Sequence, residues 1–165
     1  MPDFLIRKAG VGDVRAIHKL LMGYADKGLL LPRSFSDLYD HVRDFFLVAP
    51  RSSGLAVGCC ALHVVWEDIA EIRSLAVALE ERKKGWGQGL VKACLDEAAS
   101  LGLDRVFVLT YEIKFFERFG FAQVSKDKLP QKVWADCLNC PKFPDCDESA
   151  MLLSLKAKPS RQDMV

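Results

Sequence analysis

One short segment, residues 82–89, restricts the possible folds of this 165-residue chain more than any other. Its sequence is Arg-Lys-Lys-Gly-Trp-Gly-Gln-Gly, and it connects a predicted strand that ends at Val77 to a predicted helix. A turn of this kind leaves backbone N–H groups unpaired at a helix N-terminus, where the helix dipole also favours an anion. Glycines allow a phosphate to approach that backbone, and the basic residues add positive charge. The segment therefore predicts a strand–turn–helix unit with a pyrophosphate site, the alternative being an ordinary glycine-rich turn.

The hydrophobic pattern of the chain predicts strands and helices in the order βααβββαβαββ. We expect Asp13 to cap the first helix and Ser36 to cap the second. The residues of the second helix expected to face inward are Leu38, Tyr39, Val42 and Phe45. The expected strands are residues 4–7, 46–49, 55–62, 70–77, 105–110, 121–124 and 150–155. These elements form one α/β domain over residues 1–165, with helices on the faces of a mixed sheet and a frayed tail at 156–165.

The composition excludes several classes of protein. The chain has 23 Lys and Arg against 22 Asp and Glu, whereas a nucleic-acid-binding protein usually has a clear basic excess. No apolar run approaches the length of a membrane span, and the N-terminus lacks the pattern of a signal peptide. We therefore expect a cytoplasmic protein with no nucleic-acid or membrane partner, in which the six cysteines form no disulfide framework.

The residues around the glycine-rich segment resemble the acetyl-CoA signature of the GNAT superfamily of N-acetyltransferases. The matching stretches are Leu-Ala-Val at 75–77, the segment at 82–87, and Phe-Phe-Glu-Arg-Phe-Gly-Phe at 115–121. A closer resemblance, to the acetyltransferase domain of N-acetylglutamate synthases, lies in residues 30–34, 71–77, 109–110, 115–121 and 129–134. The resemblance covers residues 4–155. It implies the GNAT fold, with a mostly antiparallel sheet of about six or seven strands and about four helices, in a short, single-domain enzyme.

The resemblance also implies that the chain binds acetyl-CoA and transfers its acetyl group. The backbone of Leu75 and Val77 would pair with the pantetheine, and the amides of residues 83–89 would bind the pyrophosphate. The acceptor amine would attack the thioester directly, so that no enzyme nucleophile is needed. The residues expected to contact acetyl-CoA are Leu75, Ala76, Val77, Arg82, Lys83, Lys84, Gly85, Trp86, Gly87, Gln88, Gly89 and Phe116.

Glu71, on the strand that leads into the site, is the candidate general base, acting through a water molecule. The alternative for Glu71 is a solvated carboxylate at a strand end. Many GNAT enzymes have a tyrosine that protonates the leaving thiolate where this chain has Phe116, and N-acetylglutamate synthases often lack it too. Tyr111 could replace that tyrosine, although packing is the other interpretation of Tyr111.

The resemblance to the synthases implies that the acceptor is L-glutamate, whose two carboxylates call for cations with fork geometry and a few neutral donors. The candidate substrate-binding residues, each of which is alternatively a surface residue, are Arg33, Arg73, Thr110 and Lys132. The product would be N-acetylglutamate, at the first step of arginine biosynthesis, and the enzyme could form a homodimer as GNAT proteins frequently do. Two alternatives stay open: transfer to another small amine or a protein N-terminus, and a non-catalytic acyl-CoA-binding sensor.

Three cysteines, Cys137, Cys140 and Cys146, have metal-ligand spacing for three ligands. A structural zinc ion needs a fourth ligand, which Asp136, Asp145 or a partner chain could supply. The alternative is a loop of reduced thiols that binds no metal. The sequence therefore allows a zinc site here without requiring one.

Overall fold

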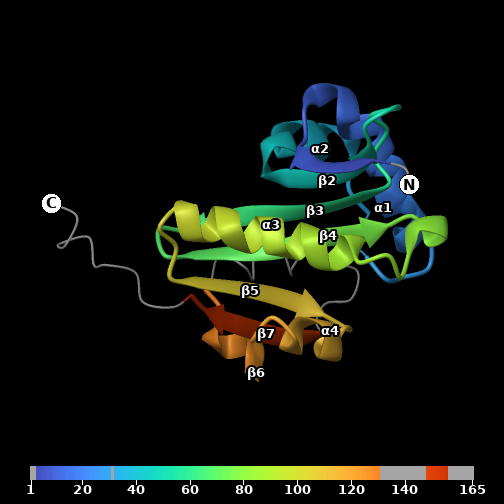
Figure 1. Cartoon of the computed structure of the whole chain (residues 1–165). Coiled ribbons are helices and arrows are strands. Elements are labelled where there is room, and N and C mark those ends of the chain that lie inside the picture. Colours follow the sequence, from blue (N-terminus) through green and yellow to red (C-terminus); the bar gives the residue numbers. More distant parts are fainter. Residues whose placement is uncertain (1–2, 31, 131–147, 156–165) are drawn as a thin grey trace, which may run out of the picture. The chain divides into compact units, whose positions relative to one another are not determined.

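The computed structural model describes residues 3–30, 32–130 and 148–155. Within these residues the elements follow the expected order βααβββαβαββ, which confirms the predicted α/β architecture (Figure 1). No helix in these ranges is long and apolar enough to cross a membrane. The elements are β1 (Phe4–Lys8), α1 (Val14–Ala25), α2 (Phe35–Asp40), β2 (Phe45–Pro50), β3 (Gly58–Trp66), β4 (Ile69–Val77), α3 (Trp86–Ser100), β5 (Arg105–Thr110), α4 (Ile113–Glu117), β6 (Ala122–Val124) and β7 (Ser149–Ser154).

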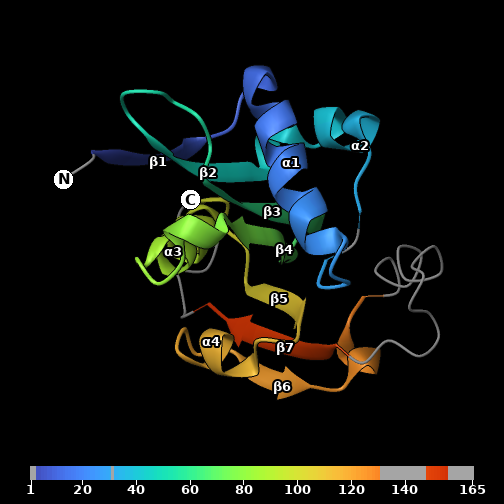
Figure 2. The ribbon, with the colours of Figure 1, turned by 90° about the vertical axis from the view of Figure 1, so that its right-hand side faces the viewer.

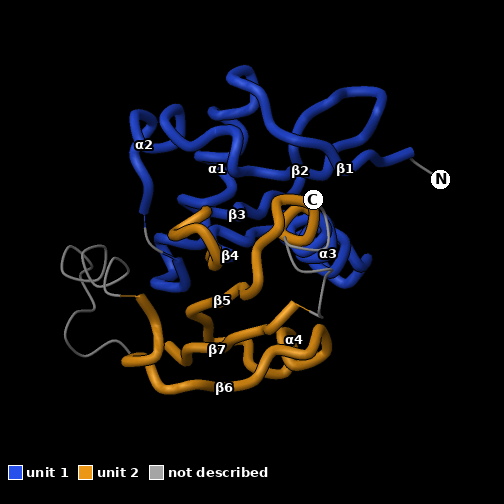
Figure 3. Tube along the Cα trace, turned by 90° about the vertical axis from the view of Figure 1, so that its left-hand side faces the viewer, with its two compact units in different colours: residues 1–63, 72–96 blue, residues 64–71, 97–165 orange. Residues whose placement is uncertain are grey.

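The chain divides into two compact units, which Figure 3 colours separately. Unit 1 comprises residues 1–63 and 72–96, and it contains β1, α1, α2, β2 and most of α3. Unit 2 comprises residues 64–71 and 97–165, and it contains β5, α4, β6 and β7. Strands β3 and β4 contribute residues to both units.

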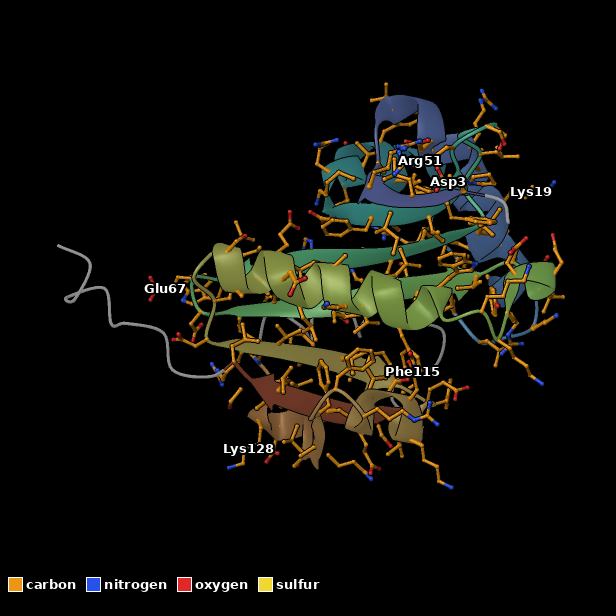
Figure 4. All side chains as sticks on the ribbon, viewed as in Figure 1. Asp3, Lys19, Arg51, Glu67, Phe115 and Lys128 are labelled. Atoms are coloured by element: carbon orange, nitrogen blue, oxygen red, sulfur yellow. The ribbon has the colours of Figure 1, made fainter. Side chains whose placement is uncertain are left out.

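The strands of unit 1 follow the order β1-β2-β3-β4. Strands β1 and β2 pair antiparallel, with Phe4 opposite Pro50, and β2 pairs antiparallel with β3. Asp3 and Arg51 lie side by side at the end of the first pair (Figure 4), where Arg51 Nε is 2.9 Å from Asp3 Oδ2. Because β2 and β3 are joined by a turn over residues 51–57, these contacts confirm the hairpin expected from the sequence.

Helix α1 covers one face of β2 and β3. Val14, Ile17 and Leu21 form its buried stripe at the three- and four-residue spacing of an amphipathic helix. The stripe belongs to one hydrophobic cluster with Leu47 of β2 and Cys59 of β3. Burying side chains of this size stabilises the fold by about 1.5–3 kcal/mol each, so the stripe fixes α1 against the strands.

Helix α3 covers the opposite face of these strands, and Figures 2 and 3 agree on this placement. Because successive strand residues point to opposite faces, Val48 lies on the side of α3 while its neighbour Leu47 lies on the side of α1. A Cβ atom on Gly58 would stand 2.9 Å from Val48 Cγ1 and 3.3 Å from Leu90 Cδ1 of α3. This close packing holds the N-terminal end of α3 in place.

The strands of unit 2 follow the order β5-β7-β6, and both pairs are antiparallel. Strand β5 pairs with β7 along its whole length, from Arg105 opposite Ser154 to Thr110 opposite Ser149. The core of this unit consists of buried apolar side chains from the ends of β3 and β4, from β5 and β7, and from the segment after β6: Val65, Ile69, Phe107, Leu129 and Ala150.

The start and the inner face of α2 differ from the sequence prediction. Ser34, rather than Ser36, caps the helix: its Oγ accepts a hydrogen bond from the Asp37 N–H at 3.0 Å, because the helix begins one residue after Ser34. Tyr39 is 46% exposed instead of facing inward. The helix has only six residues, and Leu38 is the one buried side chain that it carries.

Asp13 precedes α1 as predicted, but its side chain makes no capping hydrogen bond. Its carboxylate accepts a hydrogen bond from the Gly10 N–H at 2.8 Å, and it receives two more from the Arg7 guanidinium at 2.8 and 3.0 Å. The carboxylate oxygens of Asp13 therefore bond to Arg7 and to the turn before the helix, and not to the backbone N–H groups of α1.

Candidate active site

The candidate site is built around β4 and the segment that follows it. Strand β4 carries Glu71 and Arg73, both half-buried, before the predicted acetyl-CoA contacts at residues 75–77. Ser74 has a φ of +58°, a left-handed conformation that is uncommon for any residue except glycine. The backbone of β4 is thus distorted at one residue just before Leu75, although the strand continues through it. Residues held in such a backbone conformation cluster at active sites and ligand-binding sites.

Arg33 reaches Ser74 from the loop before α2. Its Nη1 donates a hydrogen bond of 3.1 Å to Ser74 Oγ, and its Nε donates one of 2.6 Å to Asp37 Oδ2. The guanidinium carbon lies 5.3 Å from the centre of the Phe45 ring, and the Arg33 side chain is only 10% exposed. The structure therefore places Arg33 beside β4, where its guanidinium contacts protein groups.

Asp37 is the acidic centre of this region. Burial alone would raise the pKa of its carboxyl, but the hydrogen bond from Arg33 and the electrostatic influence of Arg33, His41 and Arg73 outweigh burial and lower the pKa. His41 Nδ1 lies 3.0 Å from Asp37 Oδ1. Asp37 thus carries a negative charge at neutral pH close to two arginines, and it binds the guanidinium of Arg33 directly.

The glycine-rich segment presents its backbone as the sequence predicts. Lys83 and Gly85 have φ values of +65° and +85°, and α3 begins at the next residue, Trp86. Within the described ranges, the structure records no hydrogen-bond acceptor for the backbone N–H groups of residues 83–88. Left-handed residues next to a helix N-terminus are typical of backbone nests that bind anions.

The basic side chains of this segment are exposed to solvent. Lys84 Nζ pairs with Glu81 Oε2 at 2.9 Å, which offsets one of the positive charges. Arg82 and Lys83 form no ion pair with any other residue that the structure describes. Two uncompensated cations therefore accompany the free amides, and this charge suits a pyrophosphate.

Two residues of the segment have packing roles that the sequence analysis did not separate from ligand binding. A Cβ atom on Gly89 would stand 2.8 Å from Ile6 Cδ1 of β1, so this glycine allows α3 to approach β1. The Trp86 ring lies 4.7 Å from the Phe4 ring, measured between centroids. A Cβ atom added to Gly85, by contrast, would meet no atom within 4 Å, so the backbone of Gly85 borders open space.

Three predicted residues, Glu71, Thr110 and Phe116, belong to unit 2. Thr110 ends β5 and is 7% exposed, and its Oγ1 accepts a hydrogen bond of 2.8 Å from the Glu112 N–H. Phe116 is 3% exposed, with its ring against that of Phe121. Tyr111, the candidate substitute acid, is 39% exposed.

Four of the predicted residues lie outside the described residues: Lys132, Cys137, Cys140 and Cys146. The described part of the chain contains no group of three or more His, Cys, Asp or Glu side chains that could hold a metal ion. The possible zinc site thus stays a prediction from the cysteine spacing.

Two residues of the site, Asp37 and Ser74, were missed by the sequence analysis. For Asp37 a signal existed, because it follows Arg33 by four residues, a spacing at which an arginine and a carboxylate can form an ion pair. For Ser74 no signal existed, since its left-handed conformation and its contact with Arg33, 41 positions away, depend on the assembled fold.

The sequence matches the Acetyltransferase (GNAT) family over residues 14–121. It is 42% identical to an uncharacterised N-acetyltransferase of Chlorobaculum tepidum, over 93% of this chain and 97% of that protein. It is 40% identical to an amino-acid acetyltransferase of Mycobacterium tuberculosis, over 79% of this chain and 75% of that protein.

Solved structures show the same similarity. A Mycobacterium tuberculosis protein in complex with CoA and a second ligand is 36% identical, with a TM-score of 0.78 over 92% of this chain and 99% of that one. The N-acetylglutamate synthase of Neisseria gonorrhoeae, complexed with CoA and N-acetyl-glutamate, is 28% identical, with a TM-score of 0.84 over 95% of this chain. The chain spans only 36% of the length of that synthase.

Proposed function

Because the chain belongs to the GNAT acetyltransferase family, we propose that it transfers the acetyl group of acetyl-CoA to the α-amine of L-glutamate. The product would be N-acetylglutamate, and the reaction would be the first step of arginine biosynthesis. The observation that carries the proposal is the row of backbone amides at residues 83–88, directed at no acceptor within the described chain at the start of α3. The similarity to an amino-acid acetyltransferase and to a synthase complexed with N-acetyl-glutamate supports the choice of acceptor.

In this proposal the segment at 82–89 binds the pyrophosphate of acetyl-CoA. The amides of residues 83–88 donate hydrogen bonds to its oxygens, and the exposed Arg82 and Lys83 add positive charge. The backbone of Leu75 and Val77, just beyond the left-handed residue Ser74, pairs with the pantetheine and sets the position of the thioester. Val77 O is itself fixed by a hydrogen bond of 2.6 Å from the Tyr24 hydroxyl.

The acceptor amine must lose a proton before it attacks. Glu71 takes that proton through a water molecule, the amine nitrogen bonds to the acetyl carbon, and the carbon–sulfur bond breaks. The side chain of Phe116 has no ionisable proton, so the leaving thiolate receives its proton from water or from another group. The residues proposed to bind the carboxylates of the acceptor are three cations and one hydroxyl: Arg33, Arg73, Lys132 and Thr110.

The test is product formation from acetyl-CoA with a panel of amino acids, followed by mass spectrometry. We expect kcat/KM for glutamate to exceed that for aspartate by roughly 10- to 200-fold, because one methylene group shifts the side-chain carboxylate away from its partners. Comparable turnover of lysine or of a peptide N-terminus would contradict the choice of acceptor. Binding of acetyl-CoA without turnover of any amine would instead support a non-catalytic sensor.

A further inference from the structure

We propose that Tyr24 of α1 is a positioning residue for acetyl-CoA, because its hydroxyl group holds the last peptide group of β4 in the orientation in which the strand meets the pantetheine. The inference rests on the proposed pairing of the pantetheine with the backbone of Leu75 and Val77. Within that proposal it gives a role to a side chain that lies 53 positions away in the sequence from the residue it holds.

The peptide group between Val77 and Ala78 is held at both of its polar atoms. The Tyr24 hydroxyl donates a hydrogen bond of 2.6 Å to Val77 O. The N–H of Ala78 donates one of 2.8 Å to Val57 O, and the N–H of Val57 in turn donates to Val48 O of β2 at 2.8 Å. Two separate elements, α1 and the turn before β3, therefore fix the plane of this one peptide group.

The same two bonds show which edge of β4 carries the Tyr24 hydroxyl. The C=O and the N–H of a trans peptide group point in opposite directions, so Val77 O points away from Val57. In an extended strand the N–H and the C=O of one residue point to the same edge. The N–H of Val77 therefore points to the edge at which the Tyr24 hydroxyl lies, and this is the N–H that the proposed function pairs with the pantetheine.

The position of Tyr24 does not depend on its hydroxyl group. Its ring packs against the hydrophobic cluster that includes Ala76 of β4. Its backbone carbonyl oxygen, near the end of α1, accepts hydrogen bonds of 3.1 Å from the N–H groups of Lys27 and Leu29. Tyr24→Phe thus keeps the ring and the end of the helix, and it removes only the donor to Val77 O.

Loss of this donor should weaken the binding of the pantetheine in particular. Val77 O would exchange a fixed partner for mobile water, and the neighbouring N–H would be presented to the ligand over a wider range of directions. A neutral hydrogen bond of this kind contributes a net factor of roughly 2- to 10-fold in an equilibrium constant. The segment at 82–89 keeps its sequence and its free amides, so its interaction with the pyrophosphate should not change.

The experiment measures two dissociation constants by equilibrium titration in the full chain, one for acetyl-CoA and one for the nucleotide part of CoA without the pantetheine. In Tyr24→Phe we expect the dissociation constant of acetyl-CoA to rise roughly 2- to 10-fold, and that of the nucleotide part to stay unchanged. A merely structural loss would weaken both ligands alike. In steady-state kinetics KM for acetyl-CoA should rise, whereas KM for glutamate should not.

The matched control is Tyr39→Phe, which removes the same atom from a tyrosine that is 46% exposed and has no hydrogen bond to its side chain from any described residue. This variant should bind both ligands as the unaltered protein does. The carbonyl-carbon NMR signal of Val77 gives a direct readout of the contact, and it should move in Tyr24→Phe but not in Tyr39→Phe.

The remaining outcomes count against the inference. An unchanged dissociation constant for acetyl-CoA, an equal loss of affinity for the nucleotide part, or an unmoved Val77 signal in Tyr24→Phe would each overturn it. A rise in KM for glutamate alone would place the effect of Tyr24 on the acceptor instead. If the unaltered protein binds acetyl-CoA but does not acetylate glutamate, the choice of acceptor fails while the binding comparison still decides the role of Tyr24; if it binds no acetyl-CoA, both fail.

Discussion

The replacement of Gly85 by alanine tests the geometry of the glycine-rich segment most cleanly. Gly85 has a φ of +85°, and an added Cβ would meet no atom within 4 Å, so the only cost is the left-handed backbone. That cost is about 1–2 kcal/mol for a residue with a Cβ atom. If the segment keeps its shape, the free energy of unfolding of the ligand-free protein falls by this amount. If the segment relaxes instead, the amides lose their alignment, and the dissociation constant of acetyl-CoA rises roughly 5- to 30-fold.

Urea denaturation and an acetyl-CoA titration on the same samples measure both parts. The matched control is Gly12→Ala, because Gly12 lies outside the left-handed region and an added Cβ there also meets no atom within 4 Å. This control should leave stability unchanged or raise it by about 0.4–1 kcal/mol. If Gly85→Ala behaves like Gly12→Ala in both assays, the backbone at Gly85 has no part in the site and the reasoning is refuted.

Three further predictions follow from individual side chains. Glu71→Gln should lower kcat by roughly 10²- to 10⁴-fold in steady-state kinetics, whereas Glu80→Gln, in the exposed turn after β4, should leave kcat unchanged; equal effects would exclude Glu71 as the base. The hydrogen bond from Arg7 lowers the pKa of Asp13, so this carboxylate stabilises the fold above its unfolded pKa of about 3.9 and loses that contribution as the pH falls through the folded value. Asp13→Asn should thus cost about 1–2 kcal/mol at pH 7 in urea denaturation, and a difference that does not shrink as the pH falls below about 3.9 would contradict this. Burial raises the pKa of Cys59 to about 12, so peptide mapping after iodoacetamide treatment at pH 8 should find Cys59 alkylated only in the denatured protein.

The order of the elements followed from local sequence patterns, and the details that did not follow depend on tertiary contacts. In a helix, Val14, Ile17 and Leu21 lie on one face, so the burial of that face was predictable. The start of α2 was not predictable, because serine at position 34 or at position 36 could cap a helix equally well. In the structure Ser34 is the cap, because its Oγ accepts the hydrogen bond from the N–H of Asp37, three residues later. Tyr39 has a helical spacing that fits the core, but α2 is too short to bury it.

The candidate site divides in the same way. The segment at 82–89 was recognisable as a candidate anion site, because glycines and basic residues before a helix are visible in the sequence itself. The contact between Arg33 and Ser74 was not recognisable, because it joins the loop before α2 to the middle of β4. It also depends on a left-handed backbone at Ser74, which a serine in the sequence does not indicate. The glycine at 89 was interpreted as part of the ligand site, yet its nearest constraint is Ile6 of β1.

The most direct test of the account is an NMR titration of the isotope-labelled protein that follows the backbone amide signals of residues 83–88. These amides have no acceptor among the described residues, and the account assigns them to the pyrophosphate of acetyl-CoA. We predict large shifts of these signals with CoA and much smaller ones with acetyl-pantetheine, which lacks the pyrophosphate. Equal shifts with both ligands, or none with CoA, would contradict the central claim that this segment holds the cosubstrate.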